Sequence, residues 1–251
     1  TPMGLFDLFG RKEKRLKEAI DLSVLSTDIH SHLIPGVDDG SPDMETSIAL
    51  MRELESLGYR KIITTPHIKT DVYDNEIESL DKLGDELRHR AKMEGINLEI
   101  EVGAEHLIDD GFHRRLEQKR LKTFSGKHLL IELPFIMPPM GLNDYLFELQ
   151  LAGYKLILAH PERYLYWLGD FDKFEKLKDR GILFQLNIMS LGGYFGKDVL
   201  YLAKKLIDND MVELLGSDTH HYRHIEAIRN SLYSPALDKL IKSNAIINRK
   251  F

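Results

Sequence analysis

Short apolar runs alternate with amphipathic helical stretches along most of this 251-residue chain. The runs are rich in β-branched residues, and their starts lie roughly thirty residues apart, the size of a strand plus a helix. Near-continuous apolar runs such as residues 156–159 suit a parallel sheet that is covered on both faces. The alternation therefore predicts a parallel α/β fold. The expected strands are 24–30, 61–65, 98–103, 129–133, 155–159, 182–187 and 212–216.

The stretches between these runs carry signals for the start and the end of helices. Ser41 and Pro42 are typical of an N-cap and a first helical position. Gly95, Gly153 and Gly181 follow helical patterns at the positions where glycine commonly ends a helix. The expected helices are 42–57, 76–93, 142–152, 171–180, 198–209 and 236–242.

Side chains that can bind metals stand at the ends of nearly all the expected strands. His30 and His32 lie two positions apart at the end of the first strand, so both project to the same face. The ends of parallel strands form one ring in a barrel, whereas in an open sheet they could not all converge on one crevice. We therefore expect a distorted, seven-stranded (β/α) TIM-like barrel. The later strands carry His67, Glu105, Glu132, His160, Asp218 and His220.

The composition narrows the chemistry. The chain has no cysteine, which excludes disulfides, thiolate metal sites and a cysteine nucleophile, so His, Asp and Glu must hold any metal. The net charge of −6 gives no basic footprint, and we expect no nucleic-acid partner. No apolar run approaches the ~18 residues of a membrane span, so we expect no integral membrane segment and a cytoplasmic location.

In their order along the chain, these motifs resemble those of the PHP (polymerase and histidinol phosphatase) superfamily. Within it, the chain closely resembles the bacterial manganese-dependent protein-tyrosine phosphatases of capsule and exopolysaccharide operons, the CpsB/YwqE type. The motifs run from residue 28 to residue 220, and as a set they are highly specific. They are His30-Ser31-His32 with Val37-Asp38-Asp39-Gly40, Thr65-Pro66-His67, Gly103-Ala104-Glu105, 131–134, 158–164, 187–196 and Ser217-Asp218-Thr219-His220.

The resemblance implies a PHP fold with three divalent metal ions, manganese first and iron or zinc as alternatives. It places the first ion on His30, His32, Glu105 and Asp218. Glu105 would bridge to the second ion, which Glu132 and His160 would also bind, and the third ion would lie on Asp39, His67 and His220. The sequence alone does not decide between Asp38 and Asp39, and the family motif favours Asp39.

The resemblance also implies hydrolysis of phosphotyrosine on a protein substrate, the tyrosine-rich tail of a bacterial capsule tyrosine kinase. Arg163 and the ions would hold the phosphoryl oxygens, and one metal or a nearby histidine, His220 or His221, would assist the departing phenolate. His221, Arg223 and His224 could contact the substrate, although a solvated loop at these residues fits the sequence equally well. Three alternatives stay open: a small-molecule phosphomonoesterase such as a histidinol phosphatase, a nuclease, which the lack of a basic groove disfavours, and a non-catalytic module with a relic site.

The remaining segments carry weaker expectations. Residues 1–23 would form an N-terminal extension to a PHP barrel domain of residues 24–251, with residues 3–10 covering the bottom of the barrel. Residues 134–140, which include three prolines and two methionines, would form a rim loop that contacts a peptide. Asp28 would orient a ligand imidazole. The sequence leaves open a homo-oligomer.

Overall fold

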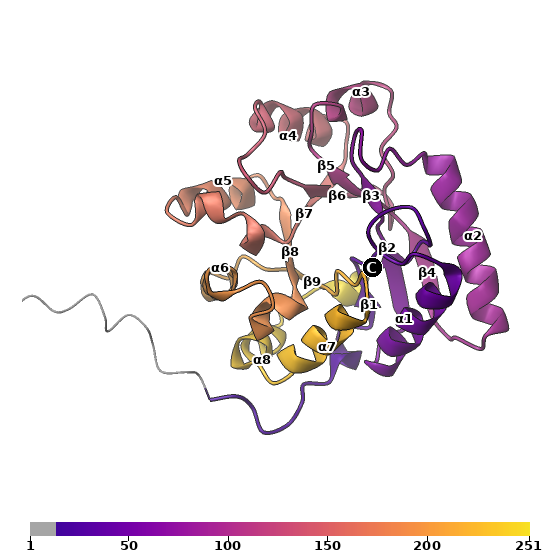
Figure 1. The fold of residues 1–251 in the computed structure, drawn as a ribbon. Coiled ribbons are helices and arrows are strands. Elements are labelled where there is room, and N and C mark those ends of the chain that lie inside the picture. The colour runs from indigo at the N-terminus through magenta and orange to yellow at the C-terminus, as the bar shows by residue number, and fades with distance from the viewer. Residues whose placement is uncertain (1–13) are drawn as a thin grey trace, which may run out of the picture.

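Strands form a ring at the centre of the molecule and helices surround it (Figure 1). The computed structural model describes residues 14–251, and every ladder between named strands in that part of the chain is parallel. The strand orders are β1-β2-β4 and β3-β5-β6-β7-β8-β9. The predicted parallel α/β fold is confirmed. The strands are β1 (Thr27–Asp28), β2 (Lys61–Thr64), β3 (His67–Ile68), β4 (Glu99–Val102), β5 (Glu105–Leu107), β6 (His128–Glu132), β7 (Lys155–Ala159), β8 (Leu183–Asn187) and β9 (Leu214–Gly216).

The structure has more strands than the seven expected from the sequence, because two of the expected strands are each followed, after a two-residue break, by a further short strand. β2 and β3 are separated at residues 65–66, where a proline cannot donate a ladder hydrogen bond, and β4 and β5 are separated at residues 103–104. Two backbone hydrogen bonds still join the two segments across this double break. The Gly103 N–H donates to the Thr64 carbonyl at 2.9 Å, and the Glu105 N–H donates to the Pro66 carbonyl at 3.1 Å. Beyond it, His67 and Glu105 are partners in register. The break therefore delivers two predicted ligands side by side.

The first and last strands meet along a seam. A parallel bridge joins Ser31 to Thr219, just beyond the ends of β1 and β9. Below it, the buried Asp28 carboxylate accepts hydrogen bonds from the Ser217 backbone N–H at 2.8 Å and from the Ser217 hydroxyl at 2.6 Å. At the opposite end of the seam, the buried Asn248 side chain donates to backbone oxygens of both strands at 2.9 and 2.7 Å. These contacts connect the two ends of the strand series.

The six expected helices are confirmed, each within two residues of its expected bounds, and α3 and α7 were not expected. The predicted cap of the first helix is wrong: Asp43, not Ser41, is the N-cap, and its carboxylate accepts a 2.8 Å hydrogen bond from the Thr46 N–H. The α-helices are α1 (Met44–Ser56), α2 (Ile77–Met93), α3 (Phe112–Glu117), α4 (Leu142–Leu151), α5 (Asp172–Asp179), α6 (Lys197–Asp208), α7 (Tyr222–Ser231) and α8 (Pro235–Lys242). The short 3-10 helices are η1 (Leu22–Val24), η2 (Pro161–Arg163), η3 (Leu165–Trp167), η4 (Ile188–Gly192) and η5 (Asn248–Lys250).

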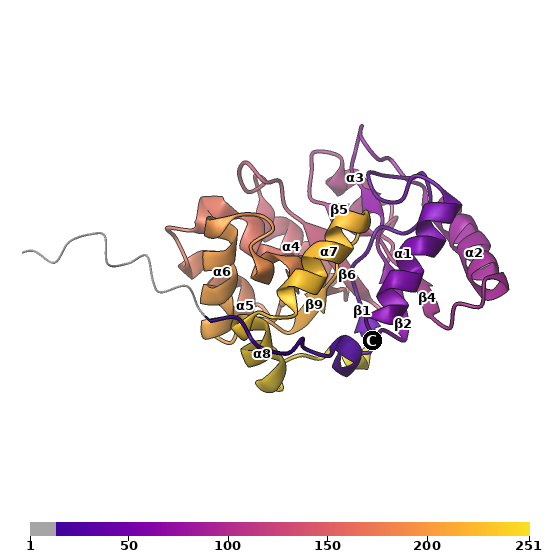
Figure 2. The same ribbon diagram turned by 60° about the horizontal axis from the view of Figure 1, so that its bottom comes forward.

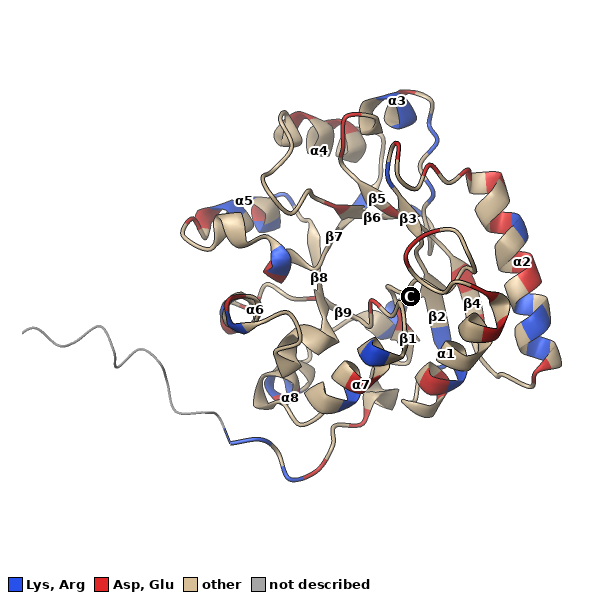
Figure 3. Ribbon diagram, in the orientation of Figure 1, with Lys and Arg blue, Asp and Glu red and all other residues tan. Residues whose placement is uncertain are grey.

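Alternating strand residues divide the core into two parts. The larger part lies between the strands and the helices and includes Leu129 and Ile131 of β6. The smaller part contains Leu130, which points the opposite way, together with Ile157 and Leu214 of other strands. It fills the inside of the ring, so the polar cluster described below rests on a packed floor. Both signs of charge are interspersed along outer helices such as α2 and α5 (Figure 3).

Residues 14–23 run along the bottom of the molecule beside α8 (Figure 2). The Leu16 N–H donates to the Tyr233 carbonyl at 3.0 Å, and the Ile20 N–H donates to the Leu232 carbonyl at 2.9 Å. The expected placement of residues 3–10 falls outside the described residues. In the part of the chain that is described, no helix combines the length and the apolar character needed to cross a membrane.

Candidate metal centre

A cavity of about 300 Å³ lies at the carboxyl ends of the strands. His30 and His32 are fully buried beneath it, and the other predicted metal ligands line it. All nine predicted ligands therefore gather at one place. The lining residues are Asp39, His67, Lys69, Glu105, Glu132, Phe135, His160, Arg163, Tyr194, Phe195, Asp218, His220, His221 and His224.

Four side chains of the predicted first set converge on one point. The Nε2 atoms of His30 and His32 are 3.2 Å apart. Each lies 3.4–3.5 Å from Oε2 of Glu105 and from Oδ1 of Asp218. Donor atoms bound to one tetrahedral cation at ~2.0–2.1 Å would lie roughly 3.3 Å apart. The spacing of these donors therefore fits a transition-metal ion.

The carboxylate oxygen Oε2 of Glu105 supports the same interpretation. It is buried and has no hydrogen-bond partner among the described residues. Yet three imidazole nitrogens surround it, from His67 at 2.9 Å, His30 at 3.4 Å and His32 at 3.5 Å. A buried carboxylate oxygen in such surroundings requires a nearby positive charge. Nitrogen and oxygen donors without thiolate suit manganese, iron or zinc.

The other oxygen of Glu105 faces the predicted second set. Oε1 lies 2.9 Å from Nε2 of His160, which is 3.7 Å from Oε1 of Glu132. His67 also approaches this group through Nδ1, at 2.9 Å from Glu105 and 3.9 Å from Glu132. The family motif assigns His67 only to the third ion, whereas its Nδ1 faces the second set and its Nε2 faces Asp39 of the third set.

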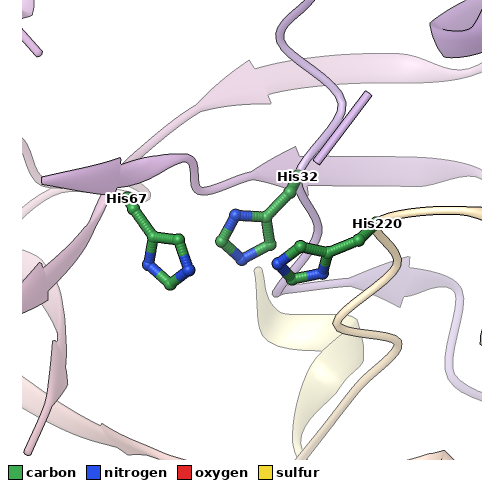
Figure 4. Close-up of side chains that lie close together, drawn as sticks. All are labelled: His32, His67 and His220. Carbon is green, nitrogen blue, oxygen red and sulfur yellow. The ribbon is translucent and has the colours of Figure 1, made fainter. Parts of the chain in front are cut away.

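Asp39, His67 and His220 form the third predicted set. Oδ1 of Asp39 lies 3.5 Å from Nε2 of His67 and 3.7 Å from Nε2 of His220. Figure 4 shows the rings of His32, His67 and His220 close together, although they come from segments far apart in the sequence. The two neighbouring aspartates have different environments: the half-exposed Asp39 faces the cavity, whereas the buried Asp38 accepts from His32 Nδ1 at 2.8 Å. This geometry favours Asp39 as the ligand and Asp38 as the group that orients His32.

The carboxylates attract positive charge into the cluster. Burial lowers the pKa of His30, but the Glu105 and Asp218 carboxylates outweigh it and raise that pKa to about 9. In the opposite direction, burial and the adjacent His32 lower the pKa of His220 to about 3. Nδ1 of His220 lies 2.9 Å from the Asp218 carbonyl, which assigns its proton to that nitrogen. Nε2 of His220 therefore offers a lone pair to the cavity, as a metal ligand must.

Polar side chains of β8 orient the first set. Gln185 Oε1 accepts from His30 Nδ1 at 2.7 Å, and Gln185 Nε2 donates to Asn187 Oδ1 at 2.9 Å. Asn187 Nδ2 then donates to Asp218 Oδ2 at 2.7 Å. This chain fixes two predicted ligands at once. The expectation that Asp28 orients an imidazole is wrong, because its carboxylate binds Ser217 at the seam.

Two of the predicted ligands have left-handed backbone conformations. The φ angles of His160 and Asp218 are +32° and +48°. Such angles are uncommon for residues other than glycine, and they persist where the surrounding structure imposes them. His160 directly follows β7, and Asp218 lies two residues after the end of β9. The backbone is therefore bent at the points where it presents these side chains.

The predicted substrate residues differ in position. Arg163 lines the cavity, and its Nη1 lies 3.8 Å from Asp218 Oδ2. His221 and His224 line the mouth, with ring centroids 4.0 Å apart. Arg223 is exposed on α7 and is not among the lining residues. The segment after residue 220 is a helix start, not a solvated loop.

Sequence reasoning missed several residues of the site. Lys69 Nζ lies 3.0 Å from Glu132 Oε2 and 3.2 Å from His67 Nε2. The position of Lys69 could have indicated this role, because it lies two residues after His67 and therefore projects to the same face. Gln185 and Asn187 have the same spacing. The segments of Phe135 and Phe195 were singled out as a rim loop and a motif, but their contacts with Arg163 had no such signal, since only the fold brings these loops together.

Comparisons with known proteins agree with one another. A sequence model of the family described as "Capsular polysaccharide synthesis, CpsB/CapC" matches residues 26–234. Tyrosine-protein phosphatase YwqE from Bacillus subtilis is 32% identical over 197 residues, 78% of each chain. Tyrosine-protein phosphatase CpsB from Streptococcus pneumoniae is 28% identical over 200 residues, 77% of this chain and 82% of the relative.

A solved structure gives the same picture in three dimensions. It comes from work on YwqE from Bacillus subtilis and CpsB from Streptococcus pneumoniae, which are described there as unique metal-dependent tyrosine phosphatases. The structure matches this chain with a TM-score of 0.76 at 30% identity, and the match covers 87% of this chain and 92% of the other.

Proposed function

Since this chain belongs to the CpsB/CapC family of capsular polysaccharide synthesis, we propose that it is a metal-dependent protein-tyrosine phosphatase. The observation that carries this proposal is the convergence of nine His, Asp and Glu side chains around a cavity that Arg163 also lines. Relatives that are tyrosine-protein phosphatases, including a metal-dependent pair, support it. We infer that residues 24–251 carry the activity as one domain.

We propose that three divalent ions, manganese first and iron or zinc as alternatives, bind the cluster. The first would lie on His30, His32, Glu105 and Asp218. The second would lie on Glu105, Glu132 and His160, and the third on Asp39, His67 and His220. The orphaned Glu105 oxygen and the donor spacings support this arrangement. When bound, the ions would activate a water molecule and stabilise the charge of the phosphoryl group.

The remaining residues of the site suit a phosphate monoester. The guanidinium of Arg163 matches a phosphoryl group with paired hydrogen bonds, so we propose that it binds the substrate phosphate. His220 keeps its proton on the nitrogen that faces the Asp218 carbonyl, so we propose that it acts as a ligand. His221, at the mouth, would donate to the departing phenolate, whose conjugate pKa of ~10 requires little assistance.

The rim of the cavity suits a protein substrate better than a small molecule. Phe135 lines the cavity, and the next residues of its loop, Ile136 and Met137, are 90% and 62% exposed. Exposed apolar side chains beside a cavity are typical of a surface that contacts a partner. We infer that the substrate is a phosphotyrosine segment such as the tail of a bacterial tyrosine kinase, and that the protein meets it in the cytoplasm.

Turnover measurements on three substrates test this proposal. The manganese-loaded protein is expected to hydrolyse a phosphotyrosine peptide and to show little activity on histidinol phosphate or on a phosphodiester. Removal of the metal with a chelator should abolish activity, and added manganese should restore it. Preference for histidinol phosphate, or activity that survives complete metal removal, would overturn the proposed function.

Two histidine variants separate the metal centre from the rest of the surface. His67→Gln should lower turnover at least about a hundredfold, because it removes a group that faces two of the proposed ions. His113→Gln is the matched control, since His113 is an exposed residue of α3 whose ring pairs with Glu117 at 3.2 Å. The control should keep its activity, and equal losses in both variants would count against the assignment of His67.

A further inference from the structure

The guanidinium of Arg163 lies against two phenyl rings that also line the cavity. Its central carbon is 4.2 Å from the ring centroid of Phe135 and 4.4 Å from that of Phe195. The three residues come from separate segments: the loop after β6, η2, and the turn between η4 and α6. Both contacts fall within the ~6 Å range of a cation–π interaction.

This arrangement leaves the edge of the guanidinium available for hydrogen bonding. Its central carbon is in contact with two rings, whereas the N–H donors point outward in the guanidinium plane. Its Nη1 atom lies 3.8 Å from Asp218 Oδ2, beyond hydrogen-bond distance. The donors of Arg163 are therefore held at the cavity, and no side chain within residues 14–251 accepts a hydrogen bond from them.

We propose that Phe135 and Phe195 are positioning residues that hold Arg163 ready for the phosphoryl group. The proposal rests on the proposed function, in which Arg163 binds the substrate phosphate. A free arginine side chain loses much rotational freedom when it binds an anion, and a side chain that is already held loses less. The two rings act on phosphate affinity through Arg163 and do not touch the phosphate themselves.

The two rings are anchored differently. Phe195 is half-buried and packs edge-to-face on Tyr194, with centroids 5.0 Å apart, and Tyr194 packs on His224 in the same manner at 5.3 Å. Phe135 is 43% exposed, and its ring centroid lies 5.7 Å from that of His160 and 6.2 Å from that of Tyr164. Phe195 is the more buried of the two rings, so we expect its replacement to have the larger effect.

Phosphate calorimetry with the manganese-loaded full chain tests this role. Phe195→Leu keeps an apolar side chain but removes the ring face, and we expect about tenfold weaker binding of inorganic phosphate and a similar rise in KM for a phosphotyrosine peptide. Phe135→Leu should have a smaller effect in the same direction. Phe195→Tyr keeps the ring and should restore binding to within about twofold of the original protein.

A double variant distinguishes positioning from general damage. In an Arg163→Ala background, Phe195→Leu should cause no further loss of phosphate affinity, because the guanidinium that the ring holds is absent. Phe171→Leu is the matched control: its ring also contacts a cation, Lys205 at 4.1 Å, but it does not line the cavity. The control should bind phosphate normally.

Several results would overturn the proposal. They are unchanged phosphate binding in Phe195→Leu, an equal loss in the Arg163→Ala background, and failure of Phe195→Tyr to restore binding. Manganese content, measured for each variant, should stay unchanged, and a loss of metal would overturn the positioning role as well. Because phosphate binding is measured without turnover, this proposal can stand or fall even if the protein does not hydrolyse phosphotyrosine.

Discussion

Pairs of polar residues two positions apart recur in the site. His30 and His32, His67 and Lys69, and Gln185 and Asn187 each place two polar side chains on the same side of a chain segment. The first pair supplies two predicted ligands, and the last pair orients His30 and Asp218. The middle pair is different, because a lysine there adds a positive charge where the other residues attract one.

Lys69 should compete with a metal ion. Its ammonium lies 3.0 Å from Glu132, and although burial lowers its pKa, the Glu132 and Glu105 carboxylates raise it further. Lys69→Met removes this cation, so we expect manganese to bind about tenfold more tightly at this position, as measured by calorimetry. The metal-free variant should also be less stable than the metal-free original, since Glu132 loses its partner.

Lys122→Met provides the comparison for Lys69. Lys122 is a buried lysine whose ammonium donates to Asp81 at 2.6 Å, and it does not line the cavity. Its replacement should lower stability without changing manganese affinity. Weaker manganese binding in Lys69→Met would show instead that Lys69 helps to form the site.

At the scale of elements, α2 lies against β4 through a residue without a side chain. A Cβ atom added to Gly84 would lie 2.4 Å from Cγ2 of Val102, which is too close for any real contact. Gly84→Ala gains up to ~1 kcal/mol of helix propensity but costs ~1–3 kcal/mol of strain. We expect a net loss of about 1–2 kcal/mol in the free energy of unfolding, measured by urea denaturation.

A second substitution tests the cause of that loss. In a Val102→Ala background the obstructing methyl group is absent, so Gly84→Ala should then be neutral or stabilising. Gly95 lies in open space but has a positive φ of 72°. The substitution Gly95→Ala should therefore destabilise the protein in both backgrounds. A loss for Gly84→Ala that is the same in both backgrounds would show that the contact with Val102 is not its source.

The sequence predicted elements with a clear apolar period and end signals, and it failed where one of these was not visible. The six expected helices are present because their apolar positions and end signals extend over several turns. The six-residue helix α3 offers too few positions for a period to be visible, and α7 follows the metal motif directly, so its polar start resembled a loop. Asp43 was missed as the cap because Ser41 and Pro42 carry the same signals two residues earlier.

At the scale of the molecule, binding of metal and folding should be coupled. The predicted ligands come from segments between residues 30 and 220 that meet only in the folded state. A metal at a hundred times its dissociation constant stabilises a fold by ~2.7 kcal/mol, which is roughly 5–10 °C for a protein of this size. We expect calorimetry to show a melting temperature lower by about that amount after chelation and restored by manganese.

The Glu105→Gln variant sharpens this measurement. It removes the carboxylate that contacts both the first and the second ligand sets, so the stabilisation by manganese should fall to a small fraction of the original. A melting temperature that does not depend on metal, in the original protein, would contradict the coupling.

The positions of the site residues were more predictable than their partners. Strand ends in a parallel barrel point to one place, so eight of the nine ligand candidates could be chosen from type and position, and Asp39 came from the family motif. The roles of Gln185, Lys69 and Phe195 depend on which side chains meet across the ring, and that information is absent from local patterns. Asp38 and Asp39 show the limit most clearly, because adjacent identical residues face different neighbours.

The paired break in the strands has a consequence for how this protein can evolve. His67 and Glu105 stay opposite each other only while the segments 61–67 and 99–105, which start at the partners Lys61 and Glu99, keep the same length. An insertion in one segment alone would slide a histidine away from the carboxylate that faces it. Across descendants of a common ancestor, length changes here should therefore be inherited in matched pairs or not at all.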